Sequence, residues 1–191
     1  MSLYALHISL ADQERVEFAR LAAERFPRFE YEAGSGFPAS PGRVQDDEIL
    51  YRLVFSPHHW DEKAKEPKPQ AFDDAFTRGM SVQRNAGVSE EQAQAMGEAV
   101  QVARRVQGKE HTFVLCAQSE AGAVRELQHS QARLAGIADT AGADDIWHAD
   151  VLARPQPSRG DKQKARFKLY RLFLRSSNRA SPESDIEMMV D

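Results

Sequence analysis

Alternating and helically spaced apolar positions divide most of the chain into short predicted elements. Apolar side chains at every second position over 49–55 are typical of a strand, and apolar positions three or four apart over 89–107 are typical of a helix. By these criteria the predicted strands are 4–8, 29–31, 49–55, 80–84, 111–117 and 146–153. The predicted helices are 10–26, 89–107, 119–128 and 162–176. Because strands and helices are interspersed with few strand–helix–strand units, we expect an α+β fold: a single domain with a small mixed or antiparallel sheet packed with about three to four helices.

Polar residues at helix ends indicate where two of these helices begin and stop. Ser89 and Gln92 have the spacing of a capping box, and Gly108 is placed to end the same helix. Ser9 is the expected cap of the first helix, because acidic Asp12 follows in its first turn.

Changes of composition divide the 191 residues into a core and flanking segments. Residues 1–45 are predicted to be a strand–helix extension that ends in a linker rich in Gly, Pro and Ser, and 46–153 to be the α+β core. Residues 154–179 are predicted to form a basic helix, and 180–191 a disordered acidic tail. With 41% hydrophobic and 28% charged residues, the chain needs neither a disulfide nor a metal to build a core.

Composition also disfavours several classes of protein. Cys116 is the only cysteine, so an internal disulfide is impossible, and its apolar neighbours predict a buried thiol. The N-terminus lacks the features of a secretory signal, and no apolar run reaches about 18 residues. We therefore expect a cytoplasmic protein without a membrane span, a metal or a cofactor. A net charge of −4 and a pI of about 5.9 argue against a surface that coats nucleic acid throughout.

The charge is distributed unevenly, with a basic segment near the C-terminus. Residues 154–179 hold nine Lys or Arg against Asp161 alone, a local net charge of +8 that leaves −12 for the rest of the chain. A single cationic stripe on the predicted helix is formed by Lys164, Lys168, Arg171 and Arg175. Such a stripe predicts contact with an acidic protein or a nucleic acid. The alternative is a solvated face that interacts with the acidic body or tail of the same chain.

Two adjacent histidines, His58 and His59, lie in a polar loop that follows a predicted strand. Imidazole titrates near neutral pH and binds metals, so these residues are candidates for acid–base chemistry or metal binding. A metal would need a third ligand, which His148 or Asp150 supplies only if their strand pairs nearby. The alternative is a solvated surface loop anchored by Trp60.

Arg52 interrupts a hydrophobic strand, where a charge must be paired or face a cleft. Together with Ser81 and Arg84 of the next strand it would form a pocket for a phosphate or carboxylate, because Arg presents a bidentate fork. The alternative is a structural ion pair between Arg52 and Asp73 or Asp74.

His148 and Asp150 alternate on one predicted strand, so their side chains share a face. The pair would support general acid–base chemistry if a nucleophile such as Ser81 or Ser56 approaches. No GxSxG motif accompanies it, and a structural histidine with satisfied hydrogen bonds is the alternative.

Short segments of the core resemble a widespread group of bacterial proteins that have no established activity. The segments are ILYR at 49–52, Ala71-Phe72, Ser81-Val82 and HADV at 148–151. The resemblance marks as candidate site positions Arg52, Phe72, Ser81, Val82, His148 and Ala149.

The chain also resembles ADP-ribosyltransferase-like folds, more loosely. That resemblance implies an NAD site in which Arg52 and Ser81 take the first two positions, on two strands. A later glutamate is expected in such a site, and Glu120 and Glu126 are available for it.

The charge layout gives the leading hypothesis, a soluble bacterial accessory or interaction protein that contacts an acidic protein or nucleic acid through its basic helix. The alternative is an enzyme acting on a nucleotide or phosphorylated substrate, either ADP-ribosyltransferase-like or a hydrolase. Its candidate catalytic residues are Arg52, His58, His59, Ser81, His148 and Asp150. A cavity in which Arg52, Ser81 and His148 converge favours the enzyme, whereas side chains that point to separate surfaces disfavour it. A third possibility is a structural subunit of a larger complex.

Overall fold

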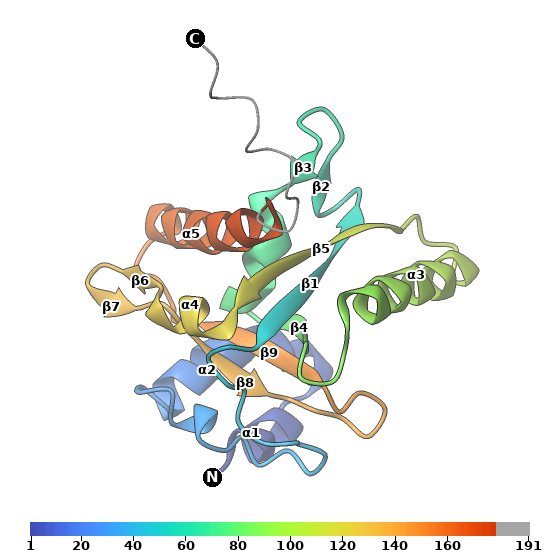
Figure 1. Ribbon diagram of the computed structural model, residues 1–191. Coiled ribbons are helices and arrows are strands. Elements are labelled where there is room, and N and C mark those ends of the chain that lie inside the picture. Colours follow the sequence, from blue (N-terminus) through green and yellow to red (C-terminus); the bar gives the residue numbers. More distant parts are fainter. Residues whose placement is uncertain (179–191) are drawn as a thin grey trace.

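The computed structural model describes the backbone of residues 1–178 and the side chains of residues 1–174. Its centre is a five-stranded sheet in the order β5-β1-β4-β9-β8 (Figure 1). The strands are β1 (Ile49–Ser56), β4 (Met80–Arg84), β5 (Thr112–Glu120), β8 (Ala135–Asp139) and β9 (His148–Ala153). Outside the sheet lie two short hairpins, β2 (Trp60–Asp61) with β3 (Glu66–Pro67) and β6 (Gln128–His129) with β7 (Ala132–Arg133). All neighbouring strands of the sheet are antiparallel, which together with the helices confirms the predicted α+β fold.

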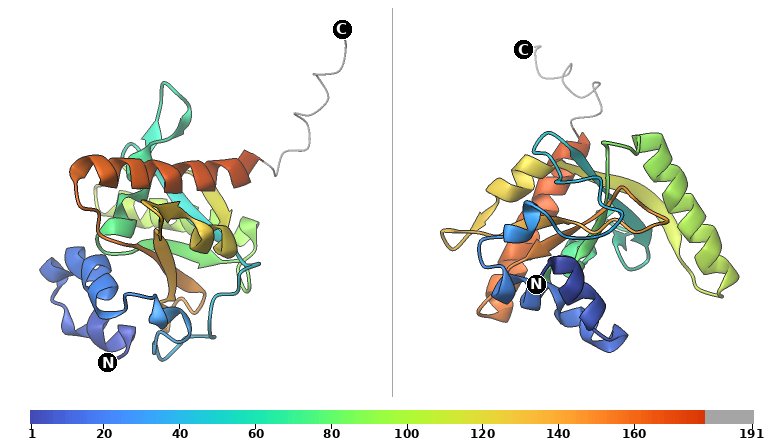
Figure 2. Two further views of the ribbon diagram at one scale, coloured as in Figure 1. Left: turned by 90° about the vertical axis from the view of Figure 1, so that its left-hand side faces the viewer. Right: turned by 90° about the horizontal axis from the view of Figure 1, so that it is seen from below.

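Helices close one face of the sheet and leave the middle of the other face open (Figure 2). The closed face is covered by α5 (Arg159–Asn178), α4 (Ala121–Glu126) and the 3-10 helix η3 (Pro69–Phe76). The open face carries α3 (Glu90–Val106) at its β5–β1 end, and α1 (Leu3–Ser9), the 3-10 helix η1 (Asp12–Glu17) and α2 (Phe18–Arg25) at its β9–β8 end. Strand β4 lies between these two groups of helices, so its open side forms the floor of a trough.

The largest part of the core lies on the closed face. Leu50 of β1 and Val82 of β4 pack there with Leu169 and Phe173 of α5. The predicted apolar side of the C-terminal helix is therefore mostly buried, although Phe167 is 44% exposed. The predicted acidic tail at 180–191 lies outside the described residues.

The N-terminal segment packs on the sheet through a second apolar cluster. Leu3, Phe18 and Ala22 contact Leu152 of β9 and Ala138 of β8 in this cluster. The segment thereby forms one wall of the trough over β4.

The strand predicted at 4–8 is wrong, because this segment is the helix α1. Ser2 caps the helix, its Oγ accepting a hydrogen bond from the backbone N–H of Ala5 at 3.1 Å. Leu3 and Leu6 point to the core at a helical spacing of three. In so short a segment the same apolar residues fit a helix and an alternating strand equally well.

Two further N-terminal predictions are also wrong. Ser9 does not cap the helix predicted at 10–26: it ends α1, and its Oγ donates to the Leu6 carbonyl at 2.7 Å. The predicted helix is instead formed by η1 and α2 in succession. The segment 29–31 is no strand, since Phe29 has a left-handed φ of 60° and precedes the 3-10 helix η2 (Glu30–Glu32).

Elements with a strong local signal agree closely with prediction. The 80–84 strand is β4, and α3 begins with the predicted capping box of Ser89 and Gln92. Gly108 follows α3 with a φ of 71°, as expected of a residue that ends a helix. The sequence did not predict β8, because its five residues are all buried and do not alternate.

Candidate functional site

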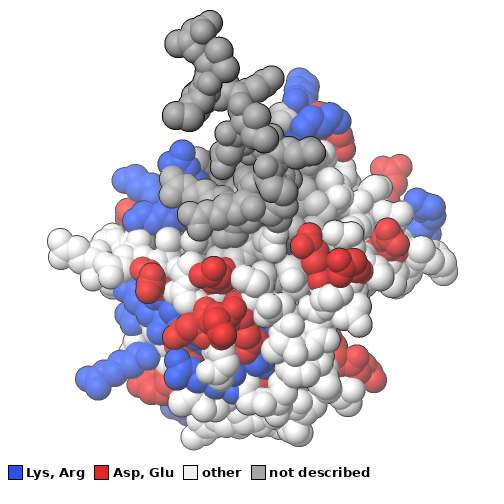
Figure 3. Space-filling view, in the orientation of Figure 1, with Lys and Arg blue, Asp and Glu red and all other residues white. Residues whose placement is uncertain are grey.

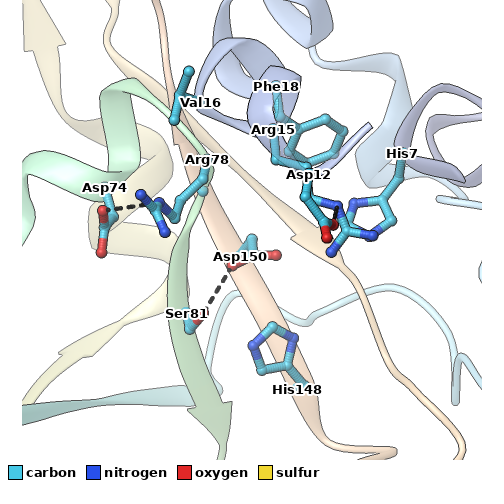
Figure 4. A pocket seen from close by; sticks show the side chains of 11 residues that line it. His7, Asp12, Arg15, Val16, Phe18, Asp74, Arg78, Ser81, His148 and Asp150 are labelled. Atoms are coloured by element: carbon cyan, nitrogen blue, oxygen red, sulfur yellow. Dashed lines mark hydrogen bonds and ion pairs between the residues drawn. The ribbon is translucent and has the colours of Figure 1, made fainter. Parts of the chain in front are cut away.

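A cavity of about 440 Å³ lies in the trough between β4 and the N-terminal helices (Figure 4). We call it the Ser81 cavity. Ser81 of β4 and His148 and Asp150 of β9 contribute its floor, and His7 of α1 and Arg78 stand around it. Ser81 is exposed, so its hydroxyl is accessible to a ligand.

Strand register explains why these side chains meet. Ser81 pairs with Asp150 and Gln83 with His148 across the antiparallel β4–β9 ladder. Paired residues point to the same face, and residues two apart on a strand share a face. Ser81, His148 and Asp150 therefore face the trough, whereas the residues between them face the core.

A hydrogen-bonded chain connects these residues through Thr140. Ser81 Oγ donates to Asp150 Oδ1 at 3.4 Å, and Thr140 Oγ1 donates to Asp150 Oδ2 at 2.9 Å. Thr140 Oγ1 also lies 2.8 Å from Nδ1 of His148. A hydroxyl has one proton, and an ionised carboxylate only accepts hydrogen bonds. Thr140 therefore accepts from Nδ1–H of His148, which leaves Nε2 of the neutral ring with a free lone pair.

Gly79 makes room for the carboxylate in this chain. It has a φ of 96°, which side chains other than glycine rarely adopt. A Cβ at this position would lie 3.0 Å from Cγ and 3.1 Å from Cβ of Asp150. The turn before β4 therefore packs closely against the side chain of Asp150.

His7 faces the cavity from the opposite wall and was not predicted as a site residue. Burial, followed by the charge of Arg15, lowers the pKa of His7, and Asp150 acts in the opposite direction. The ring is therefore neutral near pH 7, and its buried Nδ1 has no hydrogen-bond partner among the described residues. His7 was not identified from the sequence, because residues 4–8 were assigned to a strand.

Arg52 does not enter the Ser81 cavity, because it fills a split in the sheet. Strands β1 and β4 pair only at Leu50–Arg84 and Tyr51–Gln83 and diverge beyond. In the gap, the Arg52 guanidinium donates to the carbonyls of Ala71 at 3.0 Å and Ser81 at 3.1 Å. Asp74 lies 3.5 Å away, which agrees with the alternative of a structural ion pair.

A second cavity of about 270 Å³ lies over this split, on the other side of β4 from the N-terminal helices. We call it the Arg52 cavity. Its lining includes Arg52, His59, Gln83, Arg104 and His111. Ser81 and Asp74 line both cavities, so the two adjoin across β4. The candidate His58 is exposed and lines neither of them.

Arg84 is buried in a structural network and takes no part in a binding pocket, in contrast to the prediction. Its guanidinium bonds both carboxylate oxygens of Glu48 at 2.8 and 2.9 Å and Asp139 at 2.8 Å. It also donates to the carbonyls of Gly42 and Arg43. The network ties the segment before β1 to the sheet.

The side chains of residues 1–174 do not indicate metal or thiol chemistry. Within residues 1–174 no three His, Cys, Asp or Glu side chains are grouped as a metal site. The histidine loop and the β9 dyad line different cavities, so they do not share a ligand set. Cys116 is buried, and burial raises the pKa of its thiol to about 12, so the thiol stays protonated at neutral pH.

The predicted cationic stripe lies on the outer side of α5. Its described members, all exposed, are Lys164, Lys168 and Arg171. No carboxylate of the described residues pairs with them, whereas Arg166 on the same helix binds Asp73 at 2.9 Å. The side chain of Arg175 lies outside the described residues. Figure 3 shows basic side chains gathered over one end of α5.

Comparisons with protein-family models, with curated proteins and with solved structures give no match to this chain. No helix in residues 1–178 is long and apolar enough to cross a membrane. The two cavities and α5 are therefore the features from which we infer a function.

Proposed function

We propose that the protein is a hydrolase in which His148 acts as general base on a substrate held in the Ser81 cavity. The observation that carries this proposal is the pair of hydrogen bonds by which Thr140 joins His148 to Asp150, from which we infer a free lone pair on Nε2 of His148. An imidazole is suited to this role because its proton affinity lies close to neutral pH.

In the proposed step, one proton passes from water to the leaving oxygen, and the bond to that oxygen is replaced by a bond to hydroxide. Nε2 of His148 takes a proton from a water molecule, and the resulting hydroxide attacks the electrophilic atom of the substrate. The bond to the leaving oxygen breaks, and the imidazolium returns the proton to that oxygen. Asp150 stabilises the transient positive charge through Thr140, and the exposed Ser81 hydroxyl is available to orient the substrate.

A panel of chromogenic substrates tests this proposal. Nitrophenyl carboxylate esters, phosphate monoesters and phosphate diesters would be incubated with the purified chain from about pH 5 to pH 9. We expect turnover of at least one class, reduced when Thr140→Val removes the hydroxyl that orients His148. Absence of turnover with every class would contradict a hydrolase.

A second function is supported by the exposed cations on α5, which pair with no carboxylate of the described residues, although Lys168 Nζ donates to the Gln128 carbonyl at 2.7 Å. We propose that this surface contacts an acidic protein or a nucleic acid through Lys164, Lys168 and Arg171. The exposed ring of Phe167 lies among them, with the Arg171 guanidinium 5.3 Å from its centroid. Cations interleaved with an aromatic ring suit a polyanion that carries stacking groups.

Reversing this charge is expected to abolish polyanion binding. In the triple variant K164E/K168E/R171E, three attractive contacts become repulsive, so binding of a labelled single-stranded oligonucleotide or of polyglutamate should be lost in fluorescence anisotropy. For the wild type and the single-stranded oligonucleotide, three such contacts predict a slope of about −2 in log affinity against log salt.

The matched control reverses three exposed cations distant from α5 in sequence, as R25E/R28E/K63E. This control has the same net charge as the test variant and should retain binding. Equal affinity of the wild type and the α5 variant would exclude this surface.

A further inference from the structure

The Arg52 cavity gathers basic side chains from separate parts of the fold. Arg52 comes from β1, His59 from the loop after it and Arg104 from α3, and His111 immediately precedes β5. Among the described residues, the only carboxylate that lines this cavity is Asp74. Asp74 is already shared, lying 3.5 Å from Arg52 and 3.6 Å from Arg78.

The charges of Arg52 and Arg104 act on the two histidines of this cavity. Burial first, then the charge of Arg52, lowers the pKa of His59 to about 4. Burial first, then Arg104, lowers the pKa of His111. Like charges in a partly buried site disfavour protonation, whereas a bound anion would favour it. The cavity is therefore electrostatically suited to an anion.

Two buried polar atoms at the cavity have no hydrogen-bond partner in the described structure. They are Nδ1 of His59 and Oε1 of Gln83, and Gln83 is only 6% exposed. The amide nitrogen of Gln83 already donates to Asp145 at 2.7 Å, so its oxygen is the atom left to accept a hydrogen bond. Buried polar groups without a partner are uncommon, and a ligand with an O–H or N–H group would satisfy this one.

We propose that the Arg52 cavity binds the phosphate group of the substrate, a specification that rests on the proposed hydrolase. The phosphate lies against Arg52, Arg104 and the two histidines. The rest of the substrate passes over Gln83 and the exposed Ser81 hydroxyl toward His148 in the adjoining Ser81 cavity. A cavity of about 270 Å³ admits a phosphate with a few further atoms, and the larger neighbour of about 440 Å³ takes the reacting portion.

Inorganic phosphate is the probe for this subsite, followed through the side-chain NMR signals of His59 and His111. We expect saturable shifts in both signals and a rise of both pKa values when phosphate binds, because an anion stabilises the charged imidazole. Arg104→Ala should weaken phosphate binding by about tenfold or more, the effect of one charge-assisted hydrogen bond.

Arg105→Ala is the matched control, because Arg105 is the next residue of the same helix and does not line the Arg52 cavity. It should bind phosphate as the wild type does. Absence of saturable shifts in the wild type, or equal losses in the Arg104 and Arg105 variants, would overturn the subsite.

Two further measurements complete the test. One distinguishes between two sources of the phosphate, and the other tests the hydrolase and the phosphate subsite separately. Displacement of inorganic phosphate by ribose 5-phosphate supports a small phosphorylated substrate, and displacement only by a single-stranded oligonucleotide supports a nucleic-acid backbone. The His148→Gln variant should bind phosphate normally, because His148 does not line the Arg52 cavity. Failure of the hydrolase proposal would therefore appear as absence of wild-type turnover with phosphate binding intact, and failure of the subsite as wild-type turnover without saturable phosphate binding.

Discussion

Replacing His148 with glutamine is expected to reduce kcat/KM by about 10²–10⁴-fold on any substrate that the wild type hydrolyses. Glutamine is close to histidine in size, and its amide can still bond Thr140, but it cannot take up a proton. The chain of hydrogen bonds from Thr140 to Asp150 and Ser81 would remain. The loss should therefore appear in kcat, with KM nearly unchanged.

His58→Gln is the control for this prediction. His58 is exposed and lines neither cavity, so its variant should keep wild-type turnover. Thermal unfolding of both variants would show whether either change disturbs the fold. Turnover of His148→Gln within about twofold of the wild type would contradict a general base at this position.

Replacing Arg84 with methionine is expected to lower the free energy of unfolding by about 3–5 kcal/mol. The side chains of Arg84, Glu48 and Asp139 are all nearly inaccessible to solvent, at 3%, 8% and 4%. Methionine fills a similar volume but leaves two buried carboxylates without their cation. Urea unfolding measures the difference directly.

The pH dependence of this effect has a defined sign. Burial alone would raise the pKa of Glu48, but hydrogen bonds from Arg84 and from the Gln45 backbone N–H hold that pKa below its usual value. Because the folded pKa is the lower one, the stabilisation is present above the unfolded-state pKa and is lost as pH falls through the folded pKa. The difference in the free energy of unfolding between the wild type and Arg84→Met should therefore become smaller in acid.

Arg20→Met is a matched control, because Arg20 forms two ion pairs that are exposed to solvent, with Glu17 and Glu24. Such exposed pairs are screened by solvent and contribute little to stability. A loss of similar size for the Arg84 and Arg20 variants would mean that the buried network is not a major source of stability.

The sequence predicted those elements whose signal is local. Alternation identified β1 and β4, and the capping box of Ser89 with Gln92 located the start of α3. Strand β8 had no such signal, because its five buried residues do not alternate and Ile137 is its one β-branched side chain. The α1 segment was misassigned to a strand because a short apolar segment fits either period.

The candidate site was predictable only in part, because only some of its features have a local signal in the sequence. The period of a strand puts His148 and Asp150 on one face, but the approach of Ser81 depends on a register between strands far apart in sequence. Thr140 lies outside every predicted strand and helix, so its link between His148 and Asp150 could not be foreseen. The sequence left two interpretations of Arg52, a binding pocket and a structural ion pair. Which one holds depends on whether β1 and β4 stay paired, and that pairing is a property of the folded sheet.

The most direct test of a base at His148 is the tautomer of its neutral ring, measured from the side-chain nitrogen and carbon chemical shifts in NMR. The hydrogen bond to Thr140 predicts a proton on Nδ1 and a free lone pair on Nε2, with Thr140→Val allowing both tautomers. A proton on Nε2 in the wild type would contradict the account, because the lone pair would then point at Thr140 and away from any substrate in the Ser81 cavity.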